Sequence, residues 1–186
     1  MPVILWRFTD GKPGHDIQSQ GLVRALRKQT DLAVFEVAVE GGASGFGWWL
    51  TGHYPRAADL PAPDLLVGAG HATHGHLLAA RRGRGGRIIL LMKPSLPVRC
   101  FDLCMIPEHD APPKAANVLP TRGVLNDIEA ATRRDSATGL IALGGPSRHF
   151  RWDDGDVLAQ IERLPATPPV RHCLLTTSPR PPHSLP

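Results

Sequence analysis

The fold of this chain is decided by residues 3–15, which read VILWRFTDGKPGH. Apart from one arginine, residues 3–8 are apolar or aromatic, which predicts a short buried strand. Turn-forming residues follow, and apolar side chains at helical spacing then predict a helix over residues 16–28. A strand, a glycine turn and a helix in this order open a βαβ unit, so we expect a parallel sheet covered by helices.

The same alternation continues along the chain. Further strands are predicted at residues 32–39, 64–69, 87–91, 101–106, 118–121, 139–143 and 170–177. Helices are predicted at residues 72–82, 124–134 and 153–164, and residues 41–54 are expected to form a loop carrying a short amphipathic helix. Short apolar strands alternating with helices are typical of the α/β class with a Rossmann-like parallel sheet.

A polar break at residues 135–138 divides the chain. We expect a Rossmann-like domain at residues 1–134 and the start of a second, incomplete one at residues 139–178. The final stretch, 179–186, contains four prolines and is expected to be an irregular tail.

Composition excludes several classes of protein. The chain has 186 residues, 42% of them hydrophobic, and a formal net charge of +4. This composition is typical of a globular protein and excludes a disordered or fibrous chain. No apolar run approaches the roughly 20 residues of a membrane span, and the start lacks the features of a signal peptide. Three cysteines disfavour a disulfide framework and suit a reducing compartment, so we expect a cytoplasmic protein.

Three glycine-containing turns follow predicted strands, and such turns gather at the carboxyl edge of a parallel sheet. Glycine lets the backbone approach a phosphate closely, and the next helix N-terminus offers free N–H donors. These turns supply the predicted phosphate- or nucleotide-sugar-binding residues Asp10, Gly11, Lys12, Gly14, Gly70, His71, Gly144, Gly145, Ser147 and Arg148. None is a Walker-type loop or a full dinucleotide fingerprint, and the alternative is that they are ordinary connections.

General acid–base chemistry is predicted for His15, Glu108 and His109. The PEHD stretch at residues 107–110 packs three titratable groups at a strand end, where their surroundings can separate their pKa values. An exposed turn is the equal alternative. The remaining histidines and cysteines lack the spacing of metal ligands, so no metal site is predicted.

Two stretches allow a surface role. Residues 81–87 carry four arginines, which suit an anionic lipid, a nucleotide or RNA, although a solvated helix end with a glycine stop is the favoured explanation. No aromatic residues interleave with these arginines, so no nucleic-acid partner is expected. Trp48 and Trp49 suit either a membrane interface or burial beneath a loop.

Several short motifs occur in a fixed order. They are TDGKPGH at residues 9–15 with Gln18 and Gly21, PEHD at 107–110, Asn117-Val118, TRG at 121–123, GGPSRHF at 144–150 and TTS at 176–178. Together they resemble the mitochondrial-fission ELM-type family, whose bacterial members are also labelled predicted nucleoside-diphosphate-sugar epimerases.

The resemblance implies an architecture similar to GT-B glycosyltransferases, with two Rossmann-like domains facing a cleft. It implies that residues 10–15 face the acceptor, and that residues 144–147, with Thr177 and Ser178 as the next landmark, face a nucleoside-diphosphate sugar. His15 or His109 would then deprotonate the acceptor while helix N-termini stabilise the leaving diphosphate. The sugar nucleotide would be a substrate, and no cofactor is expected.

Members of that family are typically much longer, so we expect a truncated member. In intact form it would be a GT-B-like glycosyltransferase. The alternative is a non-catalytic module recruited to an anionic membrane surface or to a protein partner through residues 81–87 and Trp48-Trp49, and a third outcome is a product without activity. Its location would be cytoplasmic, peripheral to a membrane in the second case.

Overall fold

The structure is a computed structural model that describes residues 1–39, 42–129, 132–133, 135–144, 153–163 and 172–177. The chain divides into two compact units, Met1–Glu129 and Ala130–Pro186. Within the described residues, no helix is both long enough and apolar enough to cross a membrane.

The first unit is built on a six-stranded sheet in which every pair of neighbours is parallel. Its strands are β1 (Val3–Thr9), β2 (Leu32–Ala38), β3 (Leu65–Ala69), β4 (Arg87–Leu91), β5 (Leu103–Pro107) and β6 (Val118–Thr121). The spatial order is β2-β1-β3-β4-β5-β6, so the chain reverses its direction of travel across the sheet between β1 and β3. This confirms the predicted α/β class with a Rossmann-like parallel sheet.

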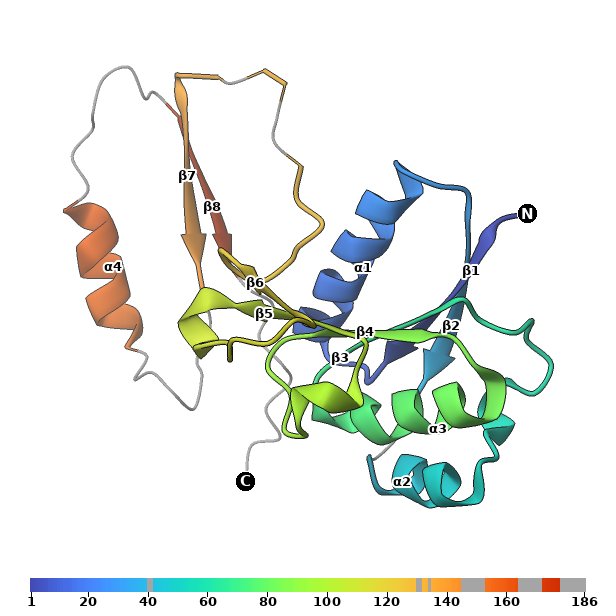
Figure 1. Cartoon of the computed structure of the whole chain (residues 1–186). Coiled ribbons are helices and arrows are strands. Elements are labelled where there is room, and N and C mark those ends of the chain that lie inside the picture. The colour runs from blue at the N-terminus through green and yellow to red at the C-terminus, as the bar shows by residue number, and fades with distance from the viewer. Residues whose placement is uncertain (40–41, 130–131, 134, 145–152, 164–171, 178–186) are drawn as a thin grey trace. The chain divides into compact units, whose positions relative to one another are not determined.

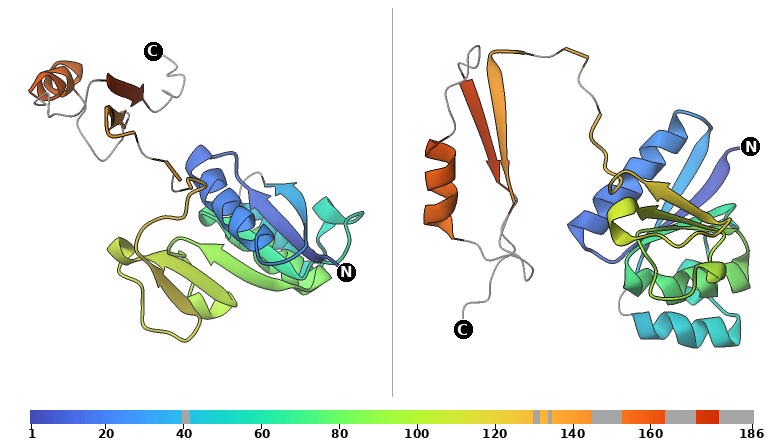
Figure 2. Two further views of the ribbon diagram at one scale, coloured as in Figure 1. Left: turned by 90° about the horizontal axis from the view of Figure 1, so that it is seen from above. Right: turned by 60° about the vertical axis from the view of Figure 1, so that its left-hand side comes forward.

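Helices cover both faces of this sheet (Figures 1 and 2). The helix α1 (Pro13–Arg27) packs on one face, where the buried side chains of Leu5 and Val67 meet it. On the other face, α3 (His74–Arg84) packs against the sheet over Trp6, and α2 (Gly42–Thr51) packs against α3. Successive residues of a strand point to opposite faces, so Leu5 and Trp6 pack into the cores on opposite faces of the sheet. Because both faces are buried, the sequence of this strand is almost continuously apolar.

Element boundaries follow local chemistry. The helix α1 begins at Pro13, earlier than predicted, because proline is favoured in the first turn of a helix. The predicted helix at residues 72–82 is a 3₁₀ turn (His71–Thr73) followed by α3, which ends before Gly85. Gly85 has a φ of 82°, a conformation that glycine adopts without strain.

The helix predicted at residues 124–134 is wrong over its described part, because residues 124–129 are not helical. The side-chain oxygen of Asn126 accepts the N–H of Ile128 at 2.9 Å, a local bond that competes with helix formation. Arg24 of α1 donates to the Asp127 carbonyl at 2.7 Å, and Leu125 packs into the α1 core. Contacts with α1 therefore override the helical pattern of this segment.

Among its described residues, the second unit has two parallel strands and one helix. The strand β7 (Thr138–Leu143) pairs with β8 (His172–Thr177), and α4 (Asp154–Glu162) lies between them in the sequence. Asp153 caps α4 by accepting the Asp156 N–H at 2.9 Å, which satisfies one of the free donors of the first turn. The βαβ order predicted for these residues is therefore present.

Candidate functional site

The candidate site lies at the carboxyl ends of β1 and β3. In open parallel sheets, ligands bind outside the carboxyl ends of the strands where the strand order reverses, and here that point lies between β1 and β3. Residues 10–12 follow β1 and lead into α1, while Gly70 follows β3 and leads into the 3₁₀ turn. Two of the three predicted glycine turns thus meet at one edge.

Asp10 and His15 form a hydrogen-bonded pair at this edge. The Nδ1 atom of His15 lies 2.9 Å from Oδ2 and 3.0 Å from Oδ1 of Asp10, whose side chain is only 3% exposed. An ionised carboxylate can only accept, so Nδ1 carries the proton and Nε2 carries the lone pair of a neutral ring. The imidazole is 18% exposed, and Nε2 has no hydrogen bond to any described residue.

Lys12 supports the same carboxylate. Its backbone N–H donates to Asp10 Oδ1 at 3.3 Å, and its Nζ lies 3.6 Å from Oδ2 while the side chain remains 67% exposed. The short segment between β1 and α1 therefore holds one buried carboxylate between a histidine and a lysine. Such a carboxylate keeps the imidazole in one tautomer and orientation.

Gly70 is in contact with His15. It has a φ of 82°, and a Cβ atom built on it would overlap the His15 ring at Cε1 and Nδ1. Thr73, which is fully buried, donates its hydroxyl to the Gly70 carbonyl at 2.8 Å and fixes the turn. The absence of a side chain at Gly70 thus leaves room for the His15 imidazole. A Cβ atom built on Gly11, which has a φ of 72°, would have no atom within 4 Å.

His71 and His74 lie beside this turn. His71 is exposed, and its ring centroid is 5.6 Å from that of the buried His74. Burial, and to a lesser degree the charge of His71, lowers the pKa of His74 to about 4. The Oγ atom of Ser95, in the segment after β4, lies 3.3 Å from His74 Nδ1. His74 is therefore neutral near pH 7, and it packs against Phe101.

Glu108 and His109 stand at the same edge but do not join the Asp10–His15 pair. They form a 3₁₀ turn with Asp110 directly after β5, and His109 is 63% exposed and 3.9 Å from the Asp110 carboxylate. Three strand spacings, about 14 Å, separate β5 from β1 across the sheet. Lys93 ties this turn to the segment after β4 by donating to the Asp110 carbonyl at 2.8 Å.

The binding residues predicted in the second unit are described only in part. Gly144 directly follows β7, and Thr177 ends β8 opposite Leu143 in the pairing register, so the two predicted residues lie at one edge of that small sheet. Gly145, Ser147, Arg148 and Ser178 lie outside the described residues. Across the part of the chain that the structure describes, no three histidine, cysteine or carboxylate side chains are grouped as metal ligands.

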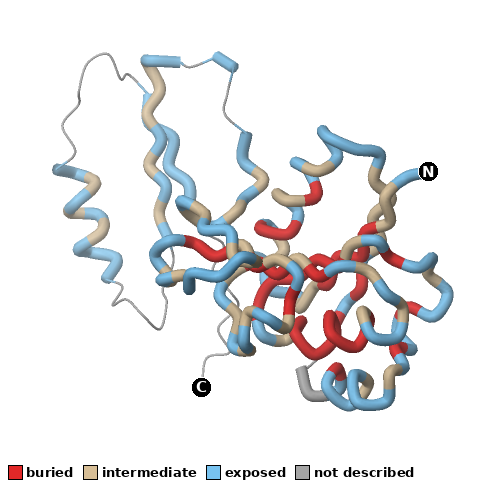
Figure 3. The backbone as a smooth tube through the Cα atoms, viewed as in Figure 1, coloured by how far each residue is buried: buried red, intermediate tan, exposed pale blue. Residues whose placement is uncertain are grey.

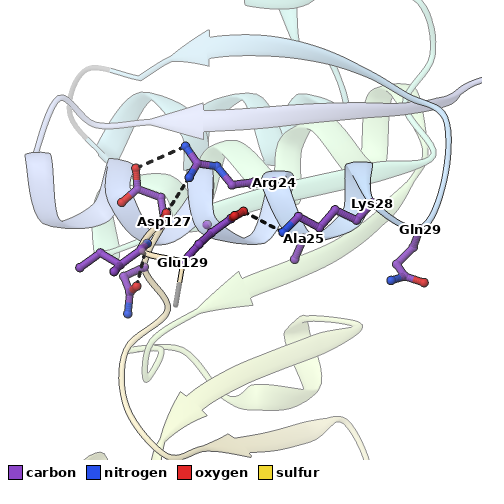
Figure 4. A pocket seen from close by; sticks show the side chains of 9 residues that line it. Arg24, Ala25, Lys28, Gln29, Asp127 and Glu129 are labelled. Atoms are coloured by element: carbon purple, nitrogen blue, oxygen red, sulfur yellow. Dashed lines mark hydrogen bonds and ion pairs between the residues drawn. The ribbon is translucent and has the colours of Figure 1, made fainter. Parts of the chain in front are cut away.

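A hollow between α1 and residues 126–129 was not predicted from the sequence (Figure 4). It has a volume of about 280 Å³, and it is crossed by the basic side chains of Arg24, in α1, and of Lys28, which directly follows α1. Arg24 bonds to the Asp127 carbonyl, and Lys28 lies 2.7 Å from a Glu129 carboxylate oxygen, which lowers the pKa of Glu129. The partners are about 100 residues apart in sequence, so no local pattern indicates this seam.

The two tryptophans that were predicted to have a surface role differ in burial. Trp48 is half-buried, with ring centroids 5.6 Å from Tyr54 and 5.5 Å from His76, and the Arg56 guanidinium lies 5.6 Å above it. Trp49, its neighbour in sequence, is exposed.

The arginines of residues 81–87 also differ in role. Arg84 donates to the carbonyls of Ala57, Ala58 and Leu60, and Arg81 pairs with Asp102 at 3.3 Å. Both side chains therefore make contacts within the folded unit. Arg82, near the end of α3, and Arg87, at the start of β4, are exposed.

A comparison with known protein families supports the resemblance. The family model described as Mitochondrial fission ELM1 matches residues 13–185, which is nearly the whole chain. No curated protein and no solved structure matches significantly. On the strength of this match and of the parallel α/β sheet, the chain belongs to the mitochondrial fission ELM1 family.

Proposed function

We propose that this chain is glycosyltransferase-like and that its first unit activates an acceptor hydroxyl for sugar transfer from a nucleoside-diphosphate sugar. The observation that carries the proposal is the Asp10–His15 pair at the carboxyl edge between β1 and β3. A histidine whose Nδ1–H is bound to a buried carboxylate presents a basic Nε2, and this is the arrangement that a general base requires.

The chemistry assigned to His15 is a single proton transfer. The acceptor oxygen forms a bond to the anomeric carbon of the sugar, and its proton passes to Nε2 of His15. The bond between the anomeric carbon and the diphosphate oxygen breaks, and its electron pair leaves with the nucleoside diphosphate. Asp10 stabilises the imidazolium that forms, because the carboxylate already lies 2.9 Å from Nδ1.

The start of α1 supports an anionic ligand at the same edge. Lys12 occupies the N-cap position and its side chain makes no capping hydrogen bond. Pro13 has no N–H, and the N–H groups of His15 and Asp16 donate to the Lys12 carbonyl, which leaves the N–H of Gly14 available in the first turn. A helix N-terminus favours a phosphate electrostatically, and the Lys12 ammonium adds an exposed positive charge. Lys12, Gly11 and Gly14 are the residues we assign to phosphate binding in this unit.

The test combines calorimetry with UDP- and GDP-sugars and an assay of nucleoside-diphosphate release with a panel of hydroxyl acceptors. We expect His15→Gln, whose amide can still donate to Asp10, to lower kcat by about 10²–10⁴-fold without changing the Kd of the donor. His53→Gln is the matched control, because this histidine is exposed and lies after α2. Absence of both heat and release with every donor, or equal activity of the two variants, would overturn the proposal.

A further inference from the structure

The outer face of α2 is apolar and exposed. The helix, GASGFGWWLT, contains no charged residue. Phe46, Trp49 and Leu50 have the spacing that places side chains on one face of a helix, and they are 38%, 38% and 69% exposed. A helix on the surface of a globular protein normally turns polar side chains outward, so a face of this kind marks an interaction site.

This face cannot turn inward, because the opposite side of α2 is already packed on α3. A Cβ atom at Gly45 would overlap the backbone of Gly75 and His76, and Trp48 packs edge-on against His76. Figure 1 shows α2 as the outermost element on this side of the sheet, and Figure 3 shows most of it exposed. The three apolar side chains are therefore held toward solvent on a fixed helix.

Positive charge borders the apolar face. The Arg82 side chain lies against the end of α2, since a Cβ atom at Gly52 would be 3.3 Å from its Nε. Residues 42–58 and 71–87, which include both packed helices, contain five arginines and no carboxylates. Arg81 and Arg84 are engaged within the fold, whereas Arg82 is exposed and lies against Gly52, next to the end of α2.

We propose that Phe46, Trp49 and Leu50 dock this protein onto an anionic lipid bilayer, with the Arg82 guanidinium bound to lipid phosphate. Tryptophan and phenylalanine favour the headgroup level of a bilayer, and a buried leucine adds apolar contact. Each arginine near an anionic surface strengthens binding, and planar guanidinium groups match phosphate oxygens. Aromatic and aliphatic side chains on the uncharged α2, with a cationic side chain of α3 next to the end of α2, fit a bilayer better than a polar protein partner. The proposal does not depend on the sugar-transfer chemistry.

The experiment is flotation of the full chain with vesicles of phosphatidylcholine, with and without phosphatidylglycerol, at low and high salt. We expect binding to the phosphatidylglycerol vesicles at low salt, together with a blue shift of tryptophan emission. Leu50→Glu and Arg82→Glu should each weaken the partition by about tenfold or more, and Arg82→Glu should also flatten the salt dependence.

Two matched variants control for these changes. Leu119→Glu introduces a carboxylate at an exposed leucine of β6, and Arg27→Glu makes the same charge reversal on α1, across the sheet from α2. Both should bind vesicles like the wild type.

Absence of flotation at low salt, or equal binding of Leu50→Glu and Leu119→Glu, would overturn the proposal. Self-association that Leu50→Glu abolishes, without vesicle binding, would overturn it as well and would assign the face to a second copy of the chain. Circular dichroism of each variant verifies that it is folded.

Discussion

The imidazole ring of His15 lies against the α-carbon of Gly70, where any side chain on residue 70 would overlap it. This contact joins the first turn of α1 to the turn after β3 at the point where the strand order reverses. The Nδ1 atom of the same ring is hydrogen-bonded to Asp10. One glycine therefore defines the position of the candidate general base.

Gly70→Ala tests this relationship. The new methyl group overlaps the imidazole, and residue 70 has a positive φ, so we expect the free energy of unfolding to fall by about 1–3 kcal/mol. We also expect the His15 ring to move away from Asp10, which NMR of the histidine ring protons detects.

Gly14→Ala is the control for Gly70→Ala. Gly14 lies in α1 with nothing within 4 Å of a built Cβ atom, so alanine there is expected to be neutral or to stabilise the helix by up to about 1 kcal/mol. Unchanged His15 resonances in Gly70→Ala would contradict the assigned contact.

Gly21→Ala tests the seam between α1 and residues 126–129. A Cβ atom at Gly21 would overlap the backbone carbonyl of Asn126, whose neighbour Asp127 is bound by Arg24 of α1. We expect a loss of about 1–3 kcal/mol and faster proteolysis within residues 124–129. Gly47→Ala, on the open side of α2, should leave the proteolysis rate unchanged.

The buried His74 predicts a pH dependence of stability. Its pKa is lowered to about 4 in the folded protein, from an ordinary value of 6.5, so between these values the unfolded chain binds a proton that the folded chain does not. Its contribution to stability is complete above pH 6.5 and is lost as the pH falls toward 4, at no more than about 1.4 kcal/mol per pH unit.

Urea unfolding of the wild type and of His74→Phe between pH 4 and 7 checks this sign. The difference in unfolding free energy between the two proteins should shift in favour of the variant as the pH falls. A His53→Gln variant controls for the loss of a histidine at an exposed position. Parallel curves for wild type and His74→Phe would contradict the prediction.

Loss of the Arg84 side chain should destabilise the fold, whereas loss of the exposed Arg82 side chain should not. Arg84 donates to three carbonyls between Ala57 and Leu60, and its guanidinium lies 5.4 Å from the Trp6 ring. Arg84→Ala is therefore expected to cost about 2–3 kcal/mol in thermal or urea unfolding. Arg82→Ala should change stability by no more than about 0.5 kcal/mol, because that side chain is exposed. Equal losses in the two variants would contradict this division of roles.

Local chemistry is enough to predict much of this fold. The strands at residues 87–91 and 118–121 have the predicted bounds, because short apolar runs bordered by glycine or other turn-forming residues have few alternatives. The same reasoning fails at residues 124–129, where the apolar spacing resembles a helix. There, hydrogen bonds from Arg24 and packing of Leu125 against α1 favour an irregular path.

The sequence by itself determined the α/β class, the succession of strands, turns and helices outside residues 124–129, and the residue types available at each strand end. Tertiary structure alone decided which of those turns meet. The strand order places β1 beside β3, which brings His15 onto Gly70 and leaves His109 three strands away. It also turned Trp48 inward and left Trp49 exposed. Strand pairing and helix docking depend on contacts between residues far apart in the chain, and no local periodicity encodes them.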